Sequence, residues 1–179
     1  MSQKILLTSK EVTIILNRLA CQLIEKHLDF SNTVLIGLQP RGKYLAQRIK
    51  QILESEYQIN NICLGFLDIT FFRDDFRRGE KPLEANITQI DFLVENKKVV
   101  FIDDVLYTGR SINAALTAIQ SFGRPIEVEL LTLIDRRFSR HLPIQPDYRG
   151  RQVDAINGEK VKVCWLEKEG EDAVYLIKE

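Results

Sequence analysis

Two adjacent carboxylates and the turn that follows them are the residues of this sequence best suited to binding a phosphorylated sugar. In residues 99–111, VVFIDDVLYTGRS, an apolar run leads into Asp103 and Asp104, and a TGRS turn follows at 108–111. A glycine lets the backbone approach a ligand, while hydroxyls and the free N–H groups of a helix start donate hydrogen bonds to an anion. Ionised carboxylates only accept hydrogen bonds, so they suit the vicinal hydroxyls of a sugar. The segment therefore predicts a site for ribose 5-phosphate.

A simpler interpretation is that Asp103 and Asp104 only end a strand and that the TGRS turn only starts a helix. The turn by itself fits both interpretations equally well. Its combination with a buried strand and paired carboxylates within 13 residues favours the binding site. The patterns GxGxxG and GxxxxGK[ST] do not occur in the sequence, which argues against a dinucleotide-binding fold and a nucleoside-triphosphate loop.

The elements around this segment must place it at the end of a buried strand. The run 99–102 is continuously apolar, as expected for a strand covered on both faces, and the helical stripe that follows stops at Gly123 and Pro125. A second strand at 33–38 ends in Gln39-Pro40-Arg41-Gly42, after which a helical stripe resumes. This alternation predicts an α/β fold, a mostly parallel central sheet flanked by helices on both faces. Ligands of such sheets bind at the carboxyl ends of the strands, in the loops 39–42, 103–111 and 135 onward.

Other elements follow from periodicity and capping. Thr8 and Glu11 have the spacing of a capping box and open a predicted helix over residues 9–29. Strands are predicted within 62–72, where Asp68 leaves the boundaries open, and at 128–134, 161–165 and 174–177, with an acidic turn at 167–172. Residues 73–91 are dense in charge and lack an apolar period, which indicates a functional lid, a weakly paired hairpin or a solvated loop.

Composition and charge limit the possible functions. The 179 residues are 45% hydrophobic and 28% charged, which is ordinary for a globular protein and predicts one domain over residues 1–179. Lysine plus arginine equal aspartate plus glutamate at 25 each, so there is no overall positive field for nucleic acid or a membrane, although a local basic patch stays open. The amino terminus has only a short apolar run, which predicts no signal peptide and a cytoplasmic protein.

Cysteine and histidine are sparse. Cys21, Cys63 and Cys164 each lie among aliphatic neighbours, which predicts reduced, buried side chains. His27 and His141 have no second ligand at metal-binding spacing, so we expect any metal to arrive with the substrate.

The block VVFIDDVLYTGRS resembles the signature with which type I phosphoribosyltransferases bind 5-phosphoribosyl-1-pyrophosphate (PRPP). Its DDVLYTGR core is similar to that of bifunctional pyrimidine operon regulators that are also uracil phosphoribosyltransferases. The resemblance covers nearly the whole chain and includes residues 37–44, 73–75, 135–136, 142–144 and 147–148. It implies the type I phosphoribosyltransferase fold and the reaction of uracil with PRPP to give UMP and pyrophosphate.

The resemblance also implies roles for individual residues. Asp103 and Asp104 are expected to hold the ribose hydroxyls and, with Arg73, to form the catalytic set. The 5-phosphate is expected on Val105, Leu106, Tyr107, Thr108, Gly109, Arg110 and Ser111. The pyrophosphate is expected on Pro40, Arg41 and Gly42, and the base or nucleotide on Arg136, Lys160 and Val161.

Closure and metal use follow from the same resemblance. A lid entered at Arg73, within about residues 73–91, is expected to exclude water from the activated sugar, and its arginines to neutralise the leaving pyrophosphate. Mg²⁺ is expected to bind through the phosphate oxygens of PRPP rather than through a protein cage.

Two alternatives stay open beside uracil transfer. One is an RNA-binding attenuator that senses UMP or UTP with vestigial catalysis, and the other is a transferase for a purine or orotate. RNA-binding relatives use a basic face on a dimer, so the resemblance implies an mRNA leader as a further partner and a homodimer or higher homo-oligomer, with no membrane. This chain departs from them at 135–143, a segment that is one residue longer than theirs and lacks their glycine. It also departs at Gln145, a position that is basic in those relatives. It is still rich in arginine there, at Arg136, Arg137, Arg140, Arg149 and Arg151.

Overall fold

A five-stranded sheet forms the centre of the molecule. The computed structural model describes residues 2–72, 86–156 and 158–178. The strands lie in the order β3-β2-β4-β5-β6, and every neighbouring pair is parallel, which confirms the predicted α/β fold. Their bounds are β2 Thr33–Leu38, β3 Cys63–Leu67, β4 Lys98–Leu106, β5 Glu127–Arg137 and β6 Tyr148–Asp154.

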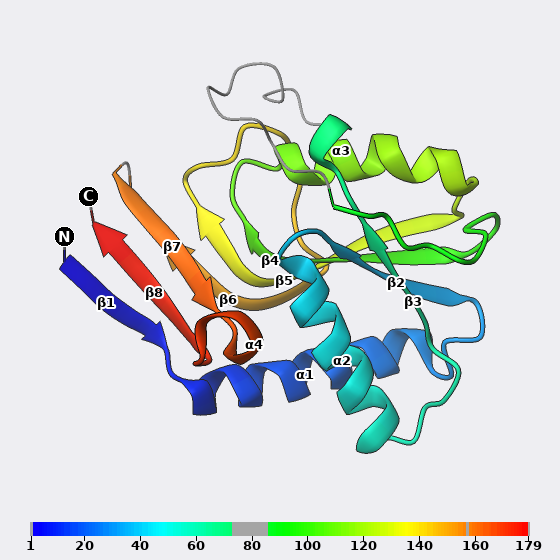
Figure 1. The fold of residues 1–179 in the computed structure, drawn as a ribbon, viewed down its shortest axis with the longest axis horizontal. Helices are drawn as coiled ribbons and strands as arrows, with labels where there is room; N and C mark the ends of the chain where they lie inside the picture. Colours follow the sequence, from blue (N-terminus) through cyan, green and yellow to red (C-terminus); the bar gives the residue numbers. More distant parts are fainter. Residues whose placement is uncertain (1, 73–85, 157, 179) are drawn as a thin grey trace.

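Helices cover both faces of this sheet. Figure 1 shows α1 (Ser9–His27) and α2 (Gly42–Ser55) beneath it and α3 (Arg110–Ile119) above it. The start of α1 is determined by neighbouring residues, since Thr8 and Glu11 form the predicted capping box there. Because successive side chains of a strand point to opposite faces, β4 supplies buried residues to both layers.

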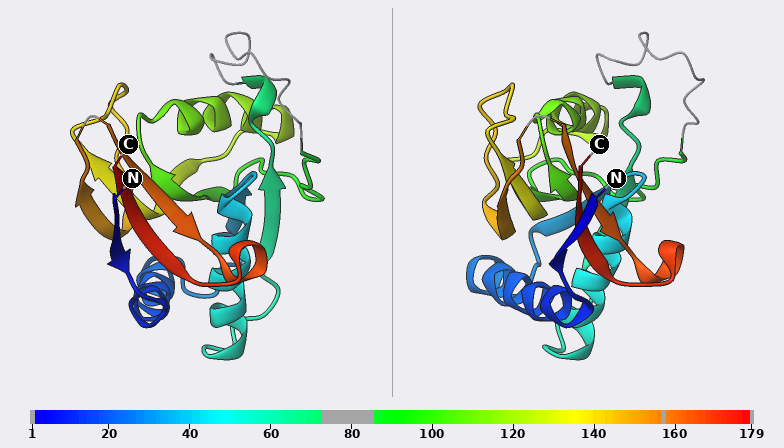
Figure 2. Two further views of the ribbon diagram at one scale, coloured as in Figure 1. Left: turned by 60° about the vertical axis from the view of Figure 1, so that its left-hand side comes forward. Right: turned by 90° about the vertical axis from the view of Figure 1, so that its left-hand side faces the viewer.

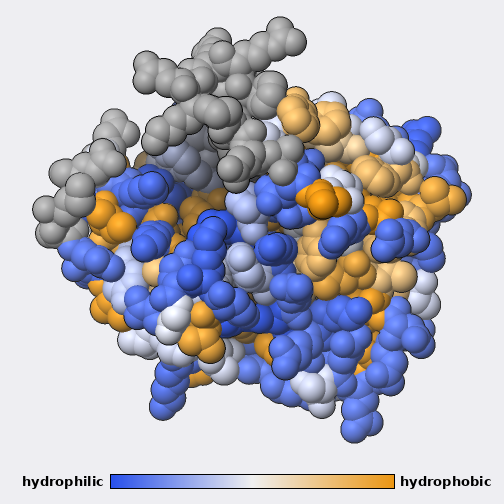
Figure 3. Space-filling model, in the orientation of Figure 1, coloured by the Kyte–Doolittle hydropathy of each residue, from blue (hydrophilic) through white to orange (hydrophobic). Residues whose placement is uncertain are grey.

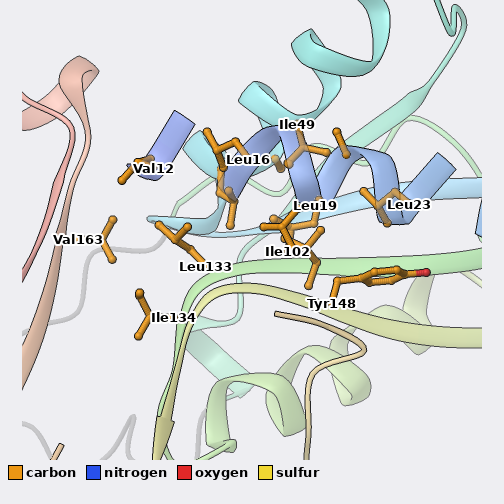
Figure 4. Packing of buried hydrophobic residues seen from close by; sticks show 14 of the residues in the cluster. Val12, Leu16, Leu19, Leu23, Ile49, Ile102, Leu133, Ile134, Tyr148 and Val163 are labelled. Atoms are coloured by element: carbon orange, nitrogen blue, oxygen red, sulfur yellow. The ribbon is translucent and has the colours of Figure 1, made fainter. Parts of the chain in front are cut away.

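The two faces of the sheet give two apolar clusters. Beneath the sheet, α1 and α2 pack on β4, β5 and β6; Figure 4 labels Leu16, Leu19, Leu23, Ile49, Ile102, Leu133 and Tyr148 among these side chains. Above it, α3 packs on the other sides of β2 and β4, through residues that include Ile36, Phe101, Ile112 and Ala115. Strand β4, which carries Asp103 and Asp104 near its carboxyl end, is thus fixed from both sides.

A separate three-stranded sheet lies against the carboxyl ends of the central strands. It consists of β1 (Ser2–Leu7), β8 (Ala173–Lys178) and β7 (Glu159–Cys164), in that order and antiparallel, with the short helix α4 (Leu166–Glu169) between β7 and β8. Figures 1 and 2 show it at one side of the molecule, where it brings the two chain ends together. The sequence predicted β7 and β8, but neither β1 nor their separation from the central sheet.

The boundaries of some elements differ from the predicted ones. Helix α1 ends at His27 rather than at residue 29, because Leu28 takes a positive φ of 53°. The predicted strand 62–72 is β3 followed by a 3₁₀ turn at Thr70–Phe72, since the carboxylate of Asp68 accepts hydrogen bonds from Thr70 N (3.0 Å) and Asn86 N (2.9 Å). The sequence did not predict strand β6, because most of its residues are polar and its apolar residues do not recur at every second position.

The cysteines correct one prediction. Cys164 is buried, but Cys21 is half-buried and Cys63 is exposed. Cys63 begins β3, which is an edge strand of the central sheet. Cys21 lies beside the buried stripe of α1, with its sulfur 2.9 Å from the hydroxyl of Tyr57. An aliphatic neighbourhood in sequence therefore does not bury a side chain that the helix or strand period turns outward.

The face of the molecule in Figure 3 is mostly polar and includes an apolar area near α3. Figure 3 shows a largely hydrophilic face on which apolar side chains gather at the right, in the region that α3 occupies in Figure 1. A cavity of about 580 Å³ lies there, lined by residues that include Leu116, Ile119, Pro125 and Val128. Among the helices that the structure describes, none combines the length and apolar character needed to cross a membrane.

A buried polar cluster joins α1 to the amino ends of the strands. The His27 side chain is fully buried; Nε2 lies 3.0 Å from Glu129 Oε2 and from the Tyr148 hydroxyl, and Nδ1 lies 3.0 Å from Thr33 Oγ1. Burial lowers the pKa of His27 below 6.5, with the carboxylate of Glu129 opposing part of that shift. The fold therefore favours the neutral imidazole.

The cluster predicts a pH dependence of stability. Because the folded pKa of His27 is depressed, the unfolded chain binds a proton more readily as the pH falls below about 6.5, and stability is lost in that direction. Between about pH 7.5 and about pH 5.5, we expect the native protein to lose up to about 1.4 kcal/mol more than a His27→Gln variant. Urea unfolding of both proteins at the two pH values measures this difference. Equal losses would contradict the depressed pKa.

Candidate active site

The carboxyl ends of β2, β4 and β5 bring together loops that are far apart in the sequence. Arg41, after β2, donates from Nε to Oδ2 of Asp104, in β4, at 3.1 Å. The segment after β5 reaches the same place, where the backbone N–H groups of His141 and Leu142 donate to the carbonyl of Thr108 at 3.0 and 3.2 Å. These contacts join the three loops that the sequence predicted to carry the site.

The end of β4 supplies both carboxylates. Asp103 is half-buried, and its Oδ1 accepts the backbone N–H of Asp104 at 2.9 Å. Asp104 is 8% exposed. Burial raises the pKa of Asp104, while the Arg41 guanidinium acts in the opposite direction. The pair thus consists of one accessible carboxylate and one that depends on a neighbouring cation.

The turn after β4 has the backbone of an anion-binding helix start. Gly109 precedes α3 with a φ of 89°, in the left-handed region that favours glycine, and a Cβ there would lie 3.3 Å from Ile144 Cδ1. The N–H groups of the first turn of α3 lack partners within the helix, as at every helix start. The predicted phosphate-binding residues form one continuous segment: Val105 and Leu106 end β4, Tyr107, Thr108 and Gly109 make the turn, and Arg110 and Ser111 start α3.

The loop after β2 is held tightly against β4. The Gln39-Pro40 peptide bond is cis, Arg41 precedes α2, and Gly42 is its first residue. A Cβ on Gly42 would lie 2.3 Å from the carbonyl oxygen of Ile102. Only a glycine therefore lets this loop approach the central strand, which puts the predicted pyrophosphate loop beside the carboxylate pair.

Arg41 is held by one carboxylate from the central sheet and by another from the short helix α4. Besides Asp104, its Nη1 and Nη2 donate to Oε1 and Oε2 of Glu169 at 3.0 and 3.3 Å, and Nη2 also donates to the carbonyl of Val163. Burial acts to lower the pKa of Arg41, but Glu169 and Asp104 outweigh it, and the pKa lies above its ordinary value. The same hydrogen bonds lower the pKa of Glu169. Sequence reasoning did not identify Glu169; only the acidic composition of residues 167–172 pointed to it.

A second arginine fixes α4 to α2. Arg48 donates to Glu167 Oε1 and Oε2 at 3.0 and 2.8 Å, and to Asp172 Oδ2 and Oδ1 at 2.9 and 2.8 Å. Its guanidinium lies 4.9 Å from the ring centroid of Trp165, which is completely buried. These paired, charge-assisted bonds attach the small sheet to the helix that begins at the pyrophosphate loop.

The predicted base-binding residues fall on two elements that meet. Arg136, in β5, is 6% exposed, stacks 3.9 Å from the ring centroid of Tyr107, and donates from Nη2 to the carbonyl of Glu159 in β7 at 2.9 Å. Within the ranges that the structure describes, it forms no ion pair, and burial lowers its pKa. In β7, Lys160 is exposed and Val161 is buried.

The arginine-rich segment after β5 is partly neutralised. Arg140 and Arg149 both pair with Asp135, and Arg137 pairs with Asp154. A hollow of about 340 Å³ lies among these side chains, with Phe138 and Gln145 also on its walls. Arg140 further donates to the carbonyl of Tyr107 at 2.5 Å, which ties this segment to the turn after β4.

The predicted lid falls mostly on residues outside the described ranges. Arg73 and the rest of 73–85 lie there, so their predicted roles remain predictions. Of the remaining part, Gln89 pairs with Phe66 of β3 in an antiparallel bridge, and Gln39 Nε2 donates to the carbonyl of Ile87 at 2.6 Å. For the residues that are described, no group of three or more His, Cys, Asp or Glu side chains is arranged to hold a metal ion.

Comparisons with known proteins agree with this arrangement. The sequence model of the phosphoribosyl transferase domain family matches residues 2–168. The chain is 42% identical to a bifunctional protein PyrR of Synechocystis over 173 residues, 97% of this chain and 96% of that protein. It is 37% identical to one of Enterococcus faecalis over 163 residues, 91% and 90% of the two chains.

Solved structures show the same fold. A purine phosphoribosyltransferase of Pyrococcus horikoshii matches with a TM-score of 0.61 and 26% identity, over 82% of this chain and 85% of that one. A hypoxanthine phosphoribosyltransferase of Trypanosoma cruzi matches with a TM-score of 0.73 over 98% and 91% of the two chains. At 15% identity, this second likeness concerns the fold alone.

The close approach at Gly42 predicts that a Gly42→Ala variant is destabilised. The added methyl group would have to displace either the backbone of β4 or the loop that carries Arg41, at a cost of roughly 1–3 kcal/mol. Urea unfolding of the variant and the native protein measures the loss. A variant as stable as the native protein would mean that this loop does not pack on Ile102 as described.

Proposed function

This chain belongs to the phosphoribosyltransferase family and, within it, to the bifunctional PyrR proteins, and from this premise we propose that it converts uracil and PRPP into UMP and pyrophosphate. The observation that supports this most is the contact of Asp104, next to Asp103, with Arg41 at the carboxyl ends of β4 and β2. With the adjoining helix start, this arrangement offers acceptors for ribose hydroxyls and donors for phosphate groups. We propose that the whole chain acts as one domain, in the cytoplasm, as a homodimer or higher oligomer.

The carboxylate pair and the turn after β4 divide the ribose 5-phosphate between them in this proposal. Asp103, the more accessible carboxylate, accepts hydrogen bonds from the ribose hydroxyls. The N–H groups and hydroxyls from Val105 to Ser111 take the 5-phosphate, helped by the positive end of the α3 dipole. Because β4 is packed on both faces, these groups are fixed before the substrate arrives, which lowers the cost of ordering it.

The reaction replaces the bond between the anomeric carbon and pyrophosphate with a bond to a ring nitrogen of the base. The nitrogen supplies the electron pair, pyrophosphate leaves with the bonding pair of the old bond, and the proton of the nitrogen passes to solvent or to the departing pyrophosphate. Positive charge develops on the sugar in between, so nearby carboxylates stabilise the transition state. Arg41, with Pro40 and Gly42, receives the departing pyrophosphate, and Arg73 and the lid contribute from the part of the chain beyond the described residues.

Mg²⁺ fits this proposal as a companion of PRPP. Hard cations prefer oxygen ligands, and Mg²⁺ usually binds through substrate phosphates and one or two carboxylates while it keeps several water molecules. Asp103 and Asp104 are adjacent at the carboxyl end of β4, beside the proposed phosphate turn, and would be the carboxylates to share the ion with PRPP. When bound, the ion neutralises charge on the pyrophosphate.

The base is proposed to lie where Arg136 meets β7, against the surface that the two form together. Arg136 is a buried cation without a carboxylate partner among the described residues, and its Nε has no hydrogen-bond partner there, so a ligand carbonyl oxygen would satisfy a donor that the protein leaves unpaired. Uracil offers two such oxygens. Lys160 and Val161 form the facing wall, on the strand whose carbonyl at Glu159 already positions Arg136.

An Asp103→Asn substitution tests the ribose assignment. The amide cannot accept as strongly from the ribose hydroxyls, so we expect kcat/KM for PRPP to fall roughly 10- to 100-fold while the urea midpoint stays unchanged. Asp29→Asn is the matched control, since Asp29 is exposed and lies before β2, at the amino ends of the central strands rather than at their carboxyl ends. Steady-state kinetics with uracil and PRPP measure both variants, and an unchanged kcat/KM in Asp103→Asn removes this residue from the ribose site.

We propose RNA binding as a second function, because the arginine-rich segment is tied to the nucleotide site. The N–H groups of His141 and Leu142 and the side chain of Arg140 all bond to the carbonyls of Thr108 and Tyr107. A nucleotide bound in the turn after β4 would therefore contact the same residues that hold the arginine-rich segment in place. We expect the affinity for a pyrimidine-operon leader transcript to increase when UMP is added. The logarithm of the association constant should fall linearly with the logarithm of the salt concentration. A transcript affinity that neither salt nor UMP changes would exclude this function.

A further inference from the structure

Glu169 accepts hydrogen bonds from the guanidinium of Arg41, which the proposed pyrophosphate site requires. A guanidinium has five N–H donors, and Arg41 commits Nε to Asp104, Nη1 to Glu169, and Nη2 to both Glu169 and Val163 O. The fork that Arg41 presents to Glu169 is the same fork that binds two oxygens of a phosphate. Pyrophosphate cannot take both donors while Glu169 keeps them.

The charges around Arg41 also oppose pyrophosphate in this arrangement. One guanidinium lies between two carboxylates, so Arg41, Asp104 and Glu169 together carry one net negative charge when both carboxylates are ionised. The side chain of Glu169 is 19% exposed and that of Arg41 is 27% exposed, so solvent screens the pair only in part. Release of Arg41 from Glu169 would leave its charge available to the leaving group.

The protein holds Glu169 firmly in this position. Its Oε2 accepts the backbone N–H of Trp165 at 2.8 Å, which fixes the side chain to the end of β7. The two bidentate pairs of Arg48 with Glu167 and Asp172 fix the surrounding α4 segment to α2. Glu169 is therefore a rigid counterion, whereas Arg41 is on the loop that precedes α2.

We propose that Glu169 is a positioning residue that competes with pyrophosphate for Arg41, so that return of Arg41 to Glu169 accompanies the release of pyrophosphate. This inference rests on the proposed function, in which Arg41 receives the leaving group. It assigns the small sheet a role in the phosphate half of the reaction, beyond its role as a wall for the base. Glu169 does not contact the reacting atoms in this proposal; it acts through Arg41.

The substitution Glu169→Gln removes the competing charge and keeps an oxygen that can accept from Trp165 N. We expect the Kd for inorganic pyrophosphate with Mg²⁺, measured by isothermal titration calorimetry, to fall about fivefold, as loss of one partly exposed ion pair suggests. The KM for PRPP and the inhibition constant of pyrophosphate should fall in parallel, with the KM for uracil unchanged. Glu169→Asp, which keeps the charge on a shorter side chain, should give a smaller decrease.

Glu167→Gln is the matched control. It removes the same charge from the same short helix, but its partner is Arg48 rather than Arg41. Its pyrophosphate affinity should equal that of the native protein. In an Arg41→Ala background, Glu169→Gln should have no effect on that affinity, because the residue through which it acts is gone.

The results separate this inference from the function on which it rests. If Arg41→Ala binds pyrophosphate as tightly as the native protein, Arg41 is not in the pyrophosphate site and both fail. If Arg41→Ala weakens binding but Glu169→Gln and Glu169→Asp bind no more tightly than the native protein, only the competition fails. Equal gains in pyrophosphate affinity in Glu169→Gln and Glu167→Gln would mean that any lost negative charge nearby has the same effect. That result would also overturn the proposed competition for Arg41.

Discussion

A buried carboxylate at the end of the central strand requires a cation, and the structure supplies that cation from the neighbouring strand's loop. Asp104 is 8% exposed, and its pKa is raised by burial even with Arg41 at 3.1 Å. An uncompensated charge in such a place would cost several kcal/mol, so the loop after β2 must stay against β4. Gly42 makes that approach sterically possible. The pyrophosphate loop, the carboxylate pair and the α4 segment of Glu169 all meet at Arg41.

The site is built at the edge of a sheet whose strands are buried on both faces. Alternate side chains of β4 pack into opposite clusters, and its last residues reach solvent only where the parallel strands end. Ligand groups placed there meet helix starts and rigid backbone rather than flexible side chains. The small antiparallel sheet then closes one side of this edge, through Val163 and Glu159, which accept from Arg41 and Arg136.

The parts predictable from sequence were those with a local cause. The buried run before Asp103, the capping box at Thr8 and the loop of Arg41 each follow from a few neighbouring residues, and the structure contains all three. The parts missed depend on tertiary pairing. Strand β1 is defined by its register with β8, β6 is a polar strand beside β5, and Cys63 is exposed because β3 lies at an edge. Glu169 is separated from Arg41 by 128 residues, so no local pattern could have paired them.

The most direct measurement of the proposed activity is PRPP-dependent product formation with uracil, hypoxanthine, guanine and orotate in parallel, with and without Mg²⁺. Arg136 has a buried Nε donor without a hydrogen-bond partner in the described chain, and we propose that Asp103 and Asp104 bind the ribose of PRPP. We expect UMP from uracil, only with Mg²⁺, and no product from the other three bases. Nucleotide formation from a purine or orotate but not from uracil, or no product from any base despite measurable PRPP binding, would contradict uracil transfer.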